Sequence, residues 1–295
     1  MSKTKSVEQL RTDCRKMLSD SFFRLWMNRY DFPELDRKQK RQIMKSFWNQ
    51  GTIGCGQIKH MEGPESLFFT GWLTQFWDYM FEPEVIRFTN PIGVSFIPSG
   101  EQQLGKTAAI GWANSGRNPI KRSVEYFIDR MVECELILHN NLIASQVGVI
   151  VNISPEEKLK AKDLIDKLLN FEPVIFTEGE INAIQSIING GATWIADKIR
   201  CMYYDYQAMC YTILGIDNTK MDSSNKEFQL TEQLDSNIAE INLYKTDIDN
   251  TIQEFLDDIE DTFGIKITKV DNLPDTTSLY EDEKKQPEVG GKEDE

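Results

Sequence analysis

Apolar residues recur at helical spacing near the start of the chain. Within residues 8–29 they lie three or four positions apart, at Leu10, Cys14, Met17 or Leu18, Phe22 and Leu25. This spacing predicts an amphipathic helix. A second helix is predicted to begin near Pro33, a favoured first helical position, and to end at Gly51. From Thr52 to Asn114 short aromatic and β-branched runs alternate with glycine and proline, which predicts a small β-rich module.

Two longer helices are predicted in the centre of the chain. The first opens with Asn118 as its cap and Pro119 at its first position, and its apolar spacing continues for about 25 residues, or roughly 40 Å. The second occupies residues 193–214 and ends at Gly215. Between them, residues 147–177 read as strand, helix and strand, a compact βαβ-like unit whose helix has a capping box starting at Ser154.

The last third of the chain opens with a polar stretch, residues 218–237. Its few apolar residues keep neither helical nor strand spacing, which predicts a loop, and a loop of this length is functional or disordered. An acidic helix is then predicted from a cap at Thr246 to Gly264, followed by the short strand "IKITKV". Residues 271–295 hold nine acidic and three basic residues, which predicts a disordered tail.

Charge is unevenly distributed along the chain. The 295 residues carry a net charge of −14, but residues 1–60 hold 13 Lys/Arg against 6 Asp/Glu. A basic end on an acidic body indicates either nucleic-acid contact at that end or a solvated surface helix. The five cysteines are odd in number and form no CxxC, which favours reduced thiols in a cytosolic protein. We expect no signal peptide and no membrane partner, because the longest apolar run has 12 residues.

One catalytic motif matches in full. "GEQQLGKT", residues 100–107, fits the pattern of a P-loop, whose backbone amides cradle phosphates. A P-loop also needs a helix behind it, and "AAIGWANSGRNP" is too rich in glycine, asparagine and proline to supply one. The segment is therefore interpreted as a turn entering a strand. His60 and His139 lack companions at metal-ligand spacing, and His139 is expected to cap a helix end. We expect no catalytic residue, no metal and no cofactor.

Several segments occur in a characteristic order: "SFFRLWMNRYDFPEL…GTIGCG", "AAIGWANSGRNP…ELILHNNLIASQVGVIV", "FEPVIF" and "ADKI…YTILGIDNT…LTEQLDSNIAEI…FGIKITKV". Their order and spacing resemble the upper-collar connector, or portal, of the small short-tailed phages that package DNA with a terminal protein. The resemblance runs from about Ser21 to Val270. It implies an α+β portal fold with long stem helices, a small SH3-like wing module and an α/β clip insert, assembled as a ring of twelve copies around DNA.

On this resemblance the chain divides into seven parts. They are N-terminal helices and the β-rich wing part (1–117), a stem helix (118–146), the clip (147–192), a second stem helix (193–216), a channel loop (217–242), a C-terminal wing part (243–271) and an acidic disordered tail (272–295). The apolar stripes of the two stem helices are expected to join neighbouring copies. These stripes contain Phe127, Met131 and Leu138 on the first helix and Ile195, Met202 and Tyr206 on the second.

The resemblance also implies where DNA is contacted. Lys198, in "ADKI", matches a lysine that faces the lumen in the family, whereas "INGGATW" departs from the family where a second lysine ring is expected. The expected channel residues are Lys198, Arg200, Lys220, Asn225, Lys226 and Gln229. Few cations suit a loop that touches DNA without holding it, because each Lys/Arg–phosphate contact adds salt-dependent attraction. The basic start is similar to a nucleic-acid-binding arm and contains Lys3, Lys5, Arg11, Arg15 and Lys16.

The implied function is a portal at one capsid vertex, used in genome packaging, DNA retention, tail attachment and ejection. The implied partners are further copies of the chain, double-stranded DNA, the major capsid or scaffold protein, the packaging motor ATPase and lower-collar or tail proteins. The implied location is the head–tail junction of the virion, after assembly in the host cytoplasm. Two alternatives remain open at this point: a P-loop NTPase using Lys106 and Thr107, and a scaffold or adaptor without a channel.

Overall fold

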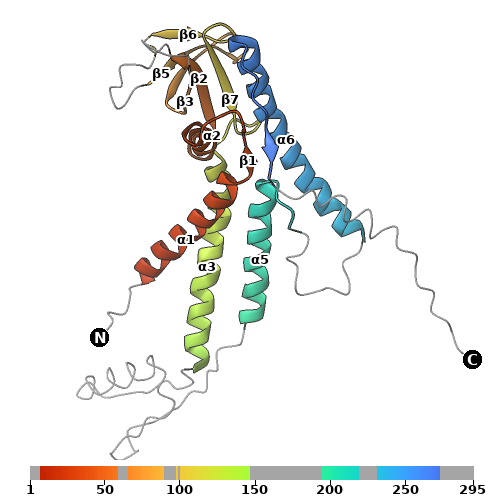
Figure 1. Ribbon diagram of the computed structural model, residues 1–295. Helices are drawn as coiled ribbons and strands as arrows, with labels where there is room; N and C mark the ends of the chain where they lie inside the picture. Colours follow the sequence, from red (N-terminus) through yellow and green to blue (C-terminus); the bar gives the residue numbers. More distant parts are fainter. Residues whose placement is uncertain are drawn as a thin grey trace, which may run out of the picture. The chain divides into compact units, whose positions relative to one another are not determined.

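The computed structural model of the chain describes residues 7–58, 66–89, 98, 100–146, 195–218 and 231–272 (Figure 1). The helices in these residues are α1 (Val7–Met27), α2 (Arg37–Asn49), α3 (Ile120–Gln146), α5 (Ala196–Ile213) and α6 (Thr231–Phe263). The strands are β1 (Tyr30–Asp31), β2 (Thr52–Ile58), β3 (Ser66–Thr70), β4 (Leu73–Trp77), β5 (Pro83–Phe88), β6 (Glu101–Gln103), β7 (Ala108–Trp112) and β8 (Val270–Asp271). The predicted mixture of helices and small sheets is confirmed.

The chain divides into two compact units. The first unit contains Met1–Arg15 and Phe127–Gln207, and the second unit contains Lys16–Tyr126 and Ala208–Glu295. Helices α1, α3 and α5 each contribute residues to both units. The predicted clip, residues 147–192, with its strands and the capping box at Ser154, lies outside the described residues.

The strands of the second unit form three antiparallel sheets. One sheet has the order β3-β2-β7, a second has the order β4-β5-β6, and β1 pairs with β8. The first two sheets pack through an apolar cluster built on Ile86, Phe88, Ala108 and Ile110. Gly54 on β2 allows this packing, because a Cβ there would lie 2.8 Å from the Phe88 ring. The predicted β-rich module is confirmed.

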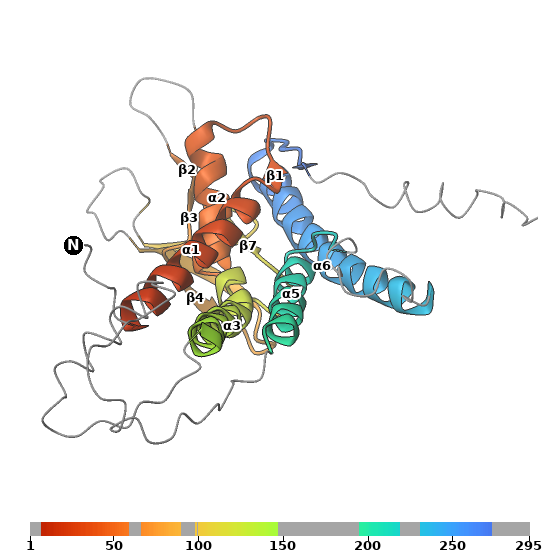
Figure 2. The same ribbon diagram turned by 90° about the horizontal axis from the view of Figure 1, so that it is seen from below.

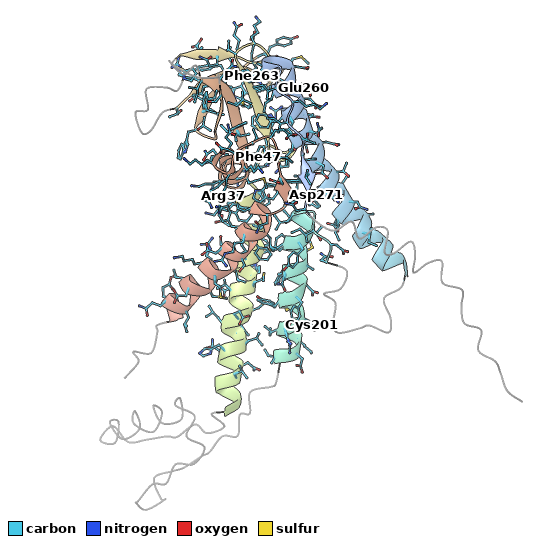
Figure 3. The ribbon with its side chains drawn as sticks, in the orientation of Figure 1. Arg37, Phe47, Cys201, Glu260, Phe263 and Asp271 are labelled. Atoms are coloured by element: carbon cyan, nitrogen blue, oxygen red, sulfur yellow. The ribbon has the colours of Figure 1, made fainter. Side chains whose placement is uncertain are left out.

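Helices α2 and α6 cover the sheet β3-β2-β7. Helix α2 packs against β2 and β3, as Figure 2 shows, and α6 packs against β7. Phe255 of α6 is buried and makes edge contacts with the rings of Phe47 and Phe69, at centroid distances of 6.3 and 6.4 Å. Trp26 of α1 joins the same core and donates a hydrogen bond to the carbonyl of Met44. Figure 3 labels Phe47 in this core.

Helix α6 is longer than the sequence predicted. A cap at Thr246 was expected, but the helix runs from Thr231 through Thr246 without a break. The expectation of a loop is therefore wrong for residues 231–237 of the polar stretch and for residues 231–242 of the predicted channel loop. The reason is visible in the pattern: Ile241 and Ile248 are buried at helical spacing on the same face as Phe255. Burial of this face stabilises a segment whose polar residues have weak helix propensity by themselves.

Helix α2 begins later than predicted. Pro33 is not its first residue; Asp36 is the cap, and its carboxylate accepts hydrogen bonds from the backbone amides of Lys38 and Gln39. The Gln39 side chain in turn accepts from the Asp36 amide, which completes a capping box. An acidic cap satisfies amides that a proline cannot satisfy, so Asp36 fixes the start of the helix.

The predicted glycine stops are confirmed. Gly51, Gly215 and Gly264 each follow a helix and have positive φ angles of 73°, 62° and 69°. At the end of α5, Gly215 donates to the Thr212 carbonyl and Ile216 donates to the Tyr211 carbonyl. These two bonds form a Schellman motif, which satisfies the last carbonyls of the helix. His139 lies inside α3 and does not cap it, because the helix continues to Gln146.

Candidate functional site

Two of the predicted channel residues, Lys198 and Arg200, lie on α5. Both side chains are exposed. An α-helix turns about 100° per residue, so positions two apart point to roughly opposite faces. Arg200 lies over the ring of Tyr204 at 5.7 Å and donates to its hydroxyl, which raises the pKa of the guanidinium. A DNA duplex that approaches α5 from one side would therefore contact only one of these two cations. Lys220, Asn225, Lys226 and Gln229 lie outside the described residues.

The apolar stripes predicted to join copies are partly used within the chain. The rings of Phe127 and Tyr206 contact each other at a centroid distance of 6.4 Å, and Met131 is fully buried. Leu138 and Ile195 are half-buried, and Met202 is 43% exposed. Other apolar residues that the sequence analysis did not name are also exposed on α3, at Ile137 and Leu142. The apolar surface that α3 and α5 offer to a neighbouring copy is therefore smaller than the sequence pattern of the two helices suggested.

The predicted basic arm is only partly described. Lys3 and Lys5 lie outside the described residues, whereas Arg11, Arg15 and Lys16 lie on α1. In the first unit, Arg11 forms an ion pair with Glu133 of α3 at 2.9 Å, and Arg15 pairs with Asp129 at 2.9 Å. These two arginines are therefore partly neutralised by α3, which leaves less charge for nucleic acid than the sequence suggested.

Residues 100–107 contain β6 and the turn, residues 104–107, that joins it to β7. Gly105 has a φ of 72°, and β7 begins at Ala108, where a P-loop would place a helix. Lys106 donates to the Gln103 side chain at 2.9 Å, and the Thr107 hydroxyl accepts from the Gln103 amide. The two residues that a P-loop uses on phosphates therefore close the turn, and the prediction of a strand entry is confirmed.

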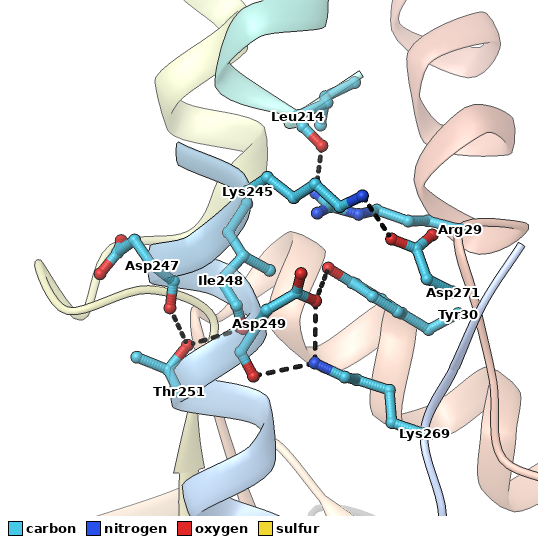
Figure 4. Close-up of polar contacts among 10 residues, drawn as sticks. All are labelled: Arg29, Tyr30, Leu214, Lys245, Asp247, Ile248, Asp249, Thr251, Lys269 and Asp271. Carbon is cyan, nitrogen blue, oxygen red and sulfur yellow. Dashed lines mark hydrogen bonds and ion pairs between the residues drawn. The ribbon is translucent and has the colours of Figure 1, made fainter. Parts of the chain in front are cut away.

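A polar network that the sequence analysis did not predict joins Arg29 and Tyr30 at β1, Asp249 of α6 and Lys269, the residue before β8 (Figure 4). Lys269 donates to the carboxylate of Asp249 at 2.8 Å, and the Tyr30 hydroxyl donates to the same carboxylate at 2.8 Å. Arg29 is fully buried, donates to the Leu214 carbonyl and lies 4.6 Å from the Tyr30 ring centroid. Its positive charge lies at the C-terminus of α5, where the helix dipole favours a cation.

Burial and hydrogen bonding shift the pKa values of this network. Burial opposes ionisation of Asp249, but the bonds from Lys269 and Tyr30 outweigh it, so the pKa of its carboxyl is lowered. Burial raises the pKa of Tyr30 well above its ordinary value. The carboxylate is therefore ionised and the phenol neutral near neutral pH. This arrangement joins β1 and the residue before β8 to α6, and its partners are too far apart in sequence for a local pattern to reveal them.

The cysteines differ strongly in exposure. Cys55, Cys134 and Cys210 are buried, Cys14 is half-buried, and Cys201 of α5 is exposed; Figure 3 labels it. Burial raises the pKa of Cys14, Cys55 and Cys134, and it raises that of Cys210 to about 12. All five cysteines are unpaired, as predicted.

The described ranges, from residue 7 to residue 272 with their gaps, contain neither a metal-ligand cluster nor a membrane span. Within those ranges no group of three or more His, Cys, Asp or Glu side chains is placed to hold a metal ion. No helix in them is both long and apolar enough to cross a membrane.

The chain is similar to known phage proteins. The family model described as Phage Connector (GP10) matches residues 100–273. A solved structure, "Portal and tail of native bacteriophage P68", matches over 93% of this chain and 92% of that chain, with a TM-score of 0.50 and 12% identity. No curated protein sequence matches. The family match contains α3, α5 and α6, and the structural match covers the fold of nearly the whole chain.

Proposed function

The chain belongs to the Phage Connector (GP10) family, and on that premise we propose that it is a portal, the head–tail connector through which phage DNA enters and leaves the capsid. The family match over residues 100–273 is the observation that carries this proposal. The likeness of the fold to a phage portal over 93% of the chain supports it independently. The role is structural: the chain positions DNA and partner proteins and does not itself perform a reaction.

The working form in this proposal is a ring of copies, and the resemblance to short-tailed phage portals leads us to expect twelve. Rings arise when two different surfaces of one chain bind each other and the rotation closes. Exposed apolar side chains on the two central helices support such contacts: Ile137 and Leu142 on α3 and Met202 on α5 are 41%, 45% and 43% exposed. Apolar side chains of this size gain free energy when a neighbouring copy covers them.

DNA passes along a lumen lined by α5 and by the segment after it. The start of that segment is fixed: Asn218 is buried and donates to the Ala208 carbonyl at 2.7 Å and to the Thr212 hydroxyl at 2.9 Å. The next twelve residues, 219–230, carry Lys220, Asn225, Lys226 and Gln229. The two lysines are offset by Asp222 and Glu227, so the segment attracts DNA only weakly and in a salt-dependent way, which allows sliding.

The remaining partners follow from the same role. A portal at the capsid vertex contacts the capsid or scaffold protein, the packaging motor ATPase and the lower-collar or tail proteins, after assembly in the host cytoplasm. We assign the motor-facing and tail-facing end to the clip, residues 147–192, and the wing to the β-rich module. The basic N-terminus, with Lys3, Lys5 and Lys16 beside the paired Arg11 and Arg15, is a secondary nucleic-acid contact.

Electron microscopy of the purified full-length chain tests the proposal directly. We expect rings with a central hole, and light scattering after size exclusion should give the mass of a multiple of the 34.1 kDa chain. A stable monomer at high protein concentration and moderate salt would contradict the ring. No observation supports the NTPase alternative, because Lys106 and Thr107 bond within their own turn.

A further inference from the structure

A groove with a volume of about 600 Å³ lies beside α2 in the second unit. We call it the basic groove, because its lining contains five cationic side chains and a single carboxylate, that of Asp31. The cations are Arg24, Arg37, Lys40, Arg41 and Lys45. A second hollow of about 500 Å³ adjoins it and shares Arg37, Arg41 and Lys45. Together they form a concave surface of strong positive charge on a chain whose net charge is −14.

Most of these cations lack an anionic partner. Lys40 pairs with Asp31 at 2.6 Å. Arg37, Arg41 and Lys45 are exposed and form no ion pair with any residue in the described ranges. They repeat at intervals of four along α2, so they share one face of the helix and repel one another. Such a face favours binding of an anion.

The floor of the groove is apolar. Phe23 and Met27 of α1, both half-buried, line it together with Met44 of α2, which is buried. A phosphate ion alone would leave this floor in water. A ligand that carries both carboxylates and apolar side chains would contact the cations and cover the floor at the same time.

The described part of the chain ends at this groove. Asn272, the last described residue, lines it, and its amide donates to the Arg29 carbonyl at 2.8 Å. Its side chain donates to the Asn28 carbonyl at 3.1 Å. Figure 3 labels Arg37 of the groove and Asp271, the residue before Asn272. The C-terminal segment, residues 273–295, therefore starts from a point fixed on the groove wall.

The C-terminal segment has the matching chemistry. It holds eight acidic and three basic residues, and it contains the run Leu279, Tyr280, Glu281, Asp282 and Glu283. Glu281 lies nine positions after Asn272, a reach of up to about 30 Å when extended. The cations of α2 from Arg37 to Lys45 span about 12 Å. The residues between Asn272 and Glu281 are thus long enough to bring the acidic run to every position of the groove. They hold it there at an effective concentration of roughly millimolar.

We propose that residues 279–283 bind in the basic groove of their own chain. Their three carboxylates face Arg37, Arg41 and Lys45, and Leu279 and Tyr280 cover the apolar floor. The occupied groove is then withheld from nucleic acid, whose phosphates would otherwise be attracted to the same cations. The contact is a salt-sensitive latch, because exposed charges are screened over about 8 Å at physiological ionic strength.

Carbodiimide cross-linking of the full-length chain, followed by mass spectrometry, tests this contact. The reagent joins carboxylates to lysines in direct contact, so we expect Glu281, Asp282 and Glu283 joined to Lys38, Lys40 and Lys45. Replacing Arg37→Gln together with Arg41→Gln keeps these lysines but removes two ion pairs. The yield of these cross-links should fall about fivefold.

A matched control removes two exposed cations outside the groove, by Lys106→Gln with Lys266→Gln, and should leave the yield unchanged. Adding 0.5 M NaCl should lower the yield in the unaltered chain. Cross-links from residues 281–283 that spread over the exposed lysines of the chain, and that the groove variant does not change, would overturn the proposal. Protection of Lys38 and Lys45 from acylation by a short DNA duplex, with no cross-links from residues 281–283, would make the groove a nucleic-acid site and equally overturn it.

Discussion

Gly111 of β7 lies directly beneath the ring of Phe255 of α6. A Cβ at position 111 would overlap this ring, with its carbon Cδ2 only 2.7 Å away. Phe255 is buried and also contacts Phe47 and Phe69, so it has no room to withdraw. The approach of α6 to the sheet therefore depends on the absence of a side chain at one position.

We expect Gly111→Ala to destabilise the protein by about 2 kcal/mol, because overpacking of a filled core costs roughly 1–3 kcal/mol. Urea unfolding followed by circular dichroism measures the change. Gly116→Ala is the control, since a Cβ there meets only the ends of two asparagine side chains, 3.2 and 3.3 Å away. Adding Phe255→Leu to Gly111→Ala should restore part of the loss; no recovery would contradict the steric explanation.

The bond between Asp249 and Lys269 predicts a pH dependence of stability. Since the folded pKa of Asp249 is below the unfolded value of about 4, the contribution is complete above that value and is lost as the pH falls through the folded value. Asp249→Asn should lower the free energy of unfolding by about 2 kcal/mol at pH 7. The difference from the unaltered chain should shrink below pH 4.

Urea unfolding at a series of pH values checks this dependence. The control is Asp257→Asn, which alters an exposed carboxylate of α6 that accepts a hydrogen bond from the Gln253 side chain. A loss of stability in Asp249→Asn that is the same at pH 3 and pH 7 would rule out the charged bond as its cause.

Ring assembly should respond to charge on the exposed apolar residues of α3 and α5. Ile137→Asp and Met202→Asp place a carboxylate where a neighbouring copy is expected to exclude water, and desolvating it is unfavourable. Each variant should keep its melting temperature within about 2 °C and shift from rings toward monomers in light scattering. Met17→Asp, at an exposed position of α1, is the control and should keep rings. Unchanged rings in both test variants would remove these residues from the interface.

Deleting residues 220–229 should leave rings intact and impair the retention of packaged DNA. The deletion spares Asn218, which is anchored by Ala208 and Thr212, and Thr231, where α6 begins. Packaging assays that score DNA protected from nuclease would show a normal start and a reduced final yield. Loss of rings in this variant would show that the segment is structural and does not serve the channel.

The sequence correctly predicted those elements whose structure is determined by residues close to one another in the chain. Glycines with positive φ end α2, α5 and α6 as expected, because few other residues adopt that conformation without strain. Helices α3 and α5 were found within three residues of their bounds, since long apolar spacing is a strong signal. The turn at Lys106 was also identified correctly, from the helix-breaking residues behind it.

Features that depend on distant partners were missed. Helix α6 begins at Thr231 because the C-terminal part of the helix packs against β7 and stabilises the whole helix. The polar residues at its start do not by themselves predict this contact. Tyr30 and Asp249 are 219 positions apart, so no local sequence pattern around either residue could predict the hydrogen bond between them. The opposite directions of Lys198 and Arg200 were available from helix geometry alone, but the resemblance grouped the two as channel residues. Which of them faces DNA stays a prediction.

Cys201 gives the native sequence a built-in attachment point. It is the one exposed thiol of the five, and it lies three residues from Lys198 on α5. A maleimide dye should therefore react there first, because burial keeps the other four thiols protonated or out of reach. The unaltered protein can thus carry a fluorophore beside the proposed DNA path. Quenching of this fluorophore by a passing duplex would measure the time at which DNA moves past each copy of the chain.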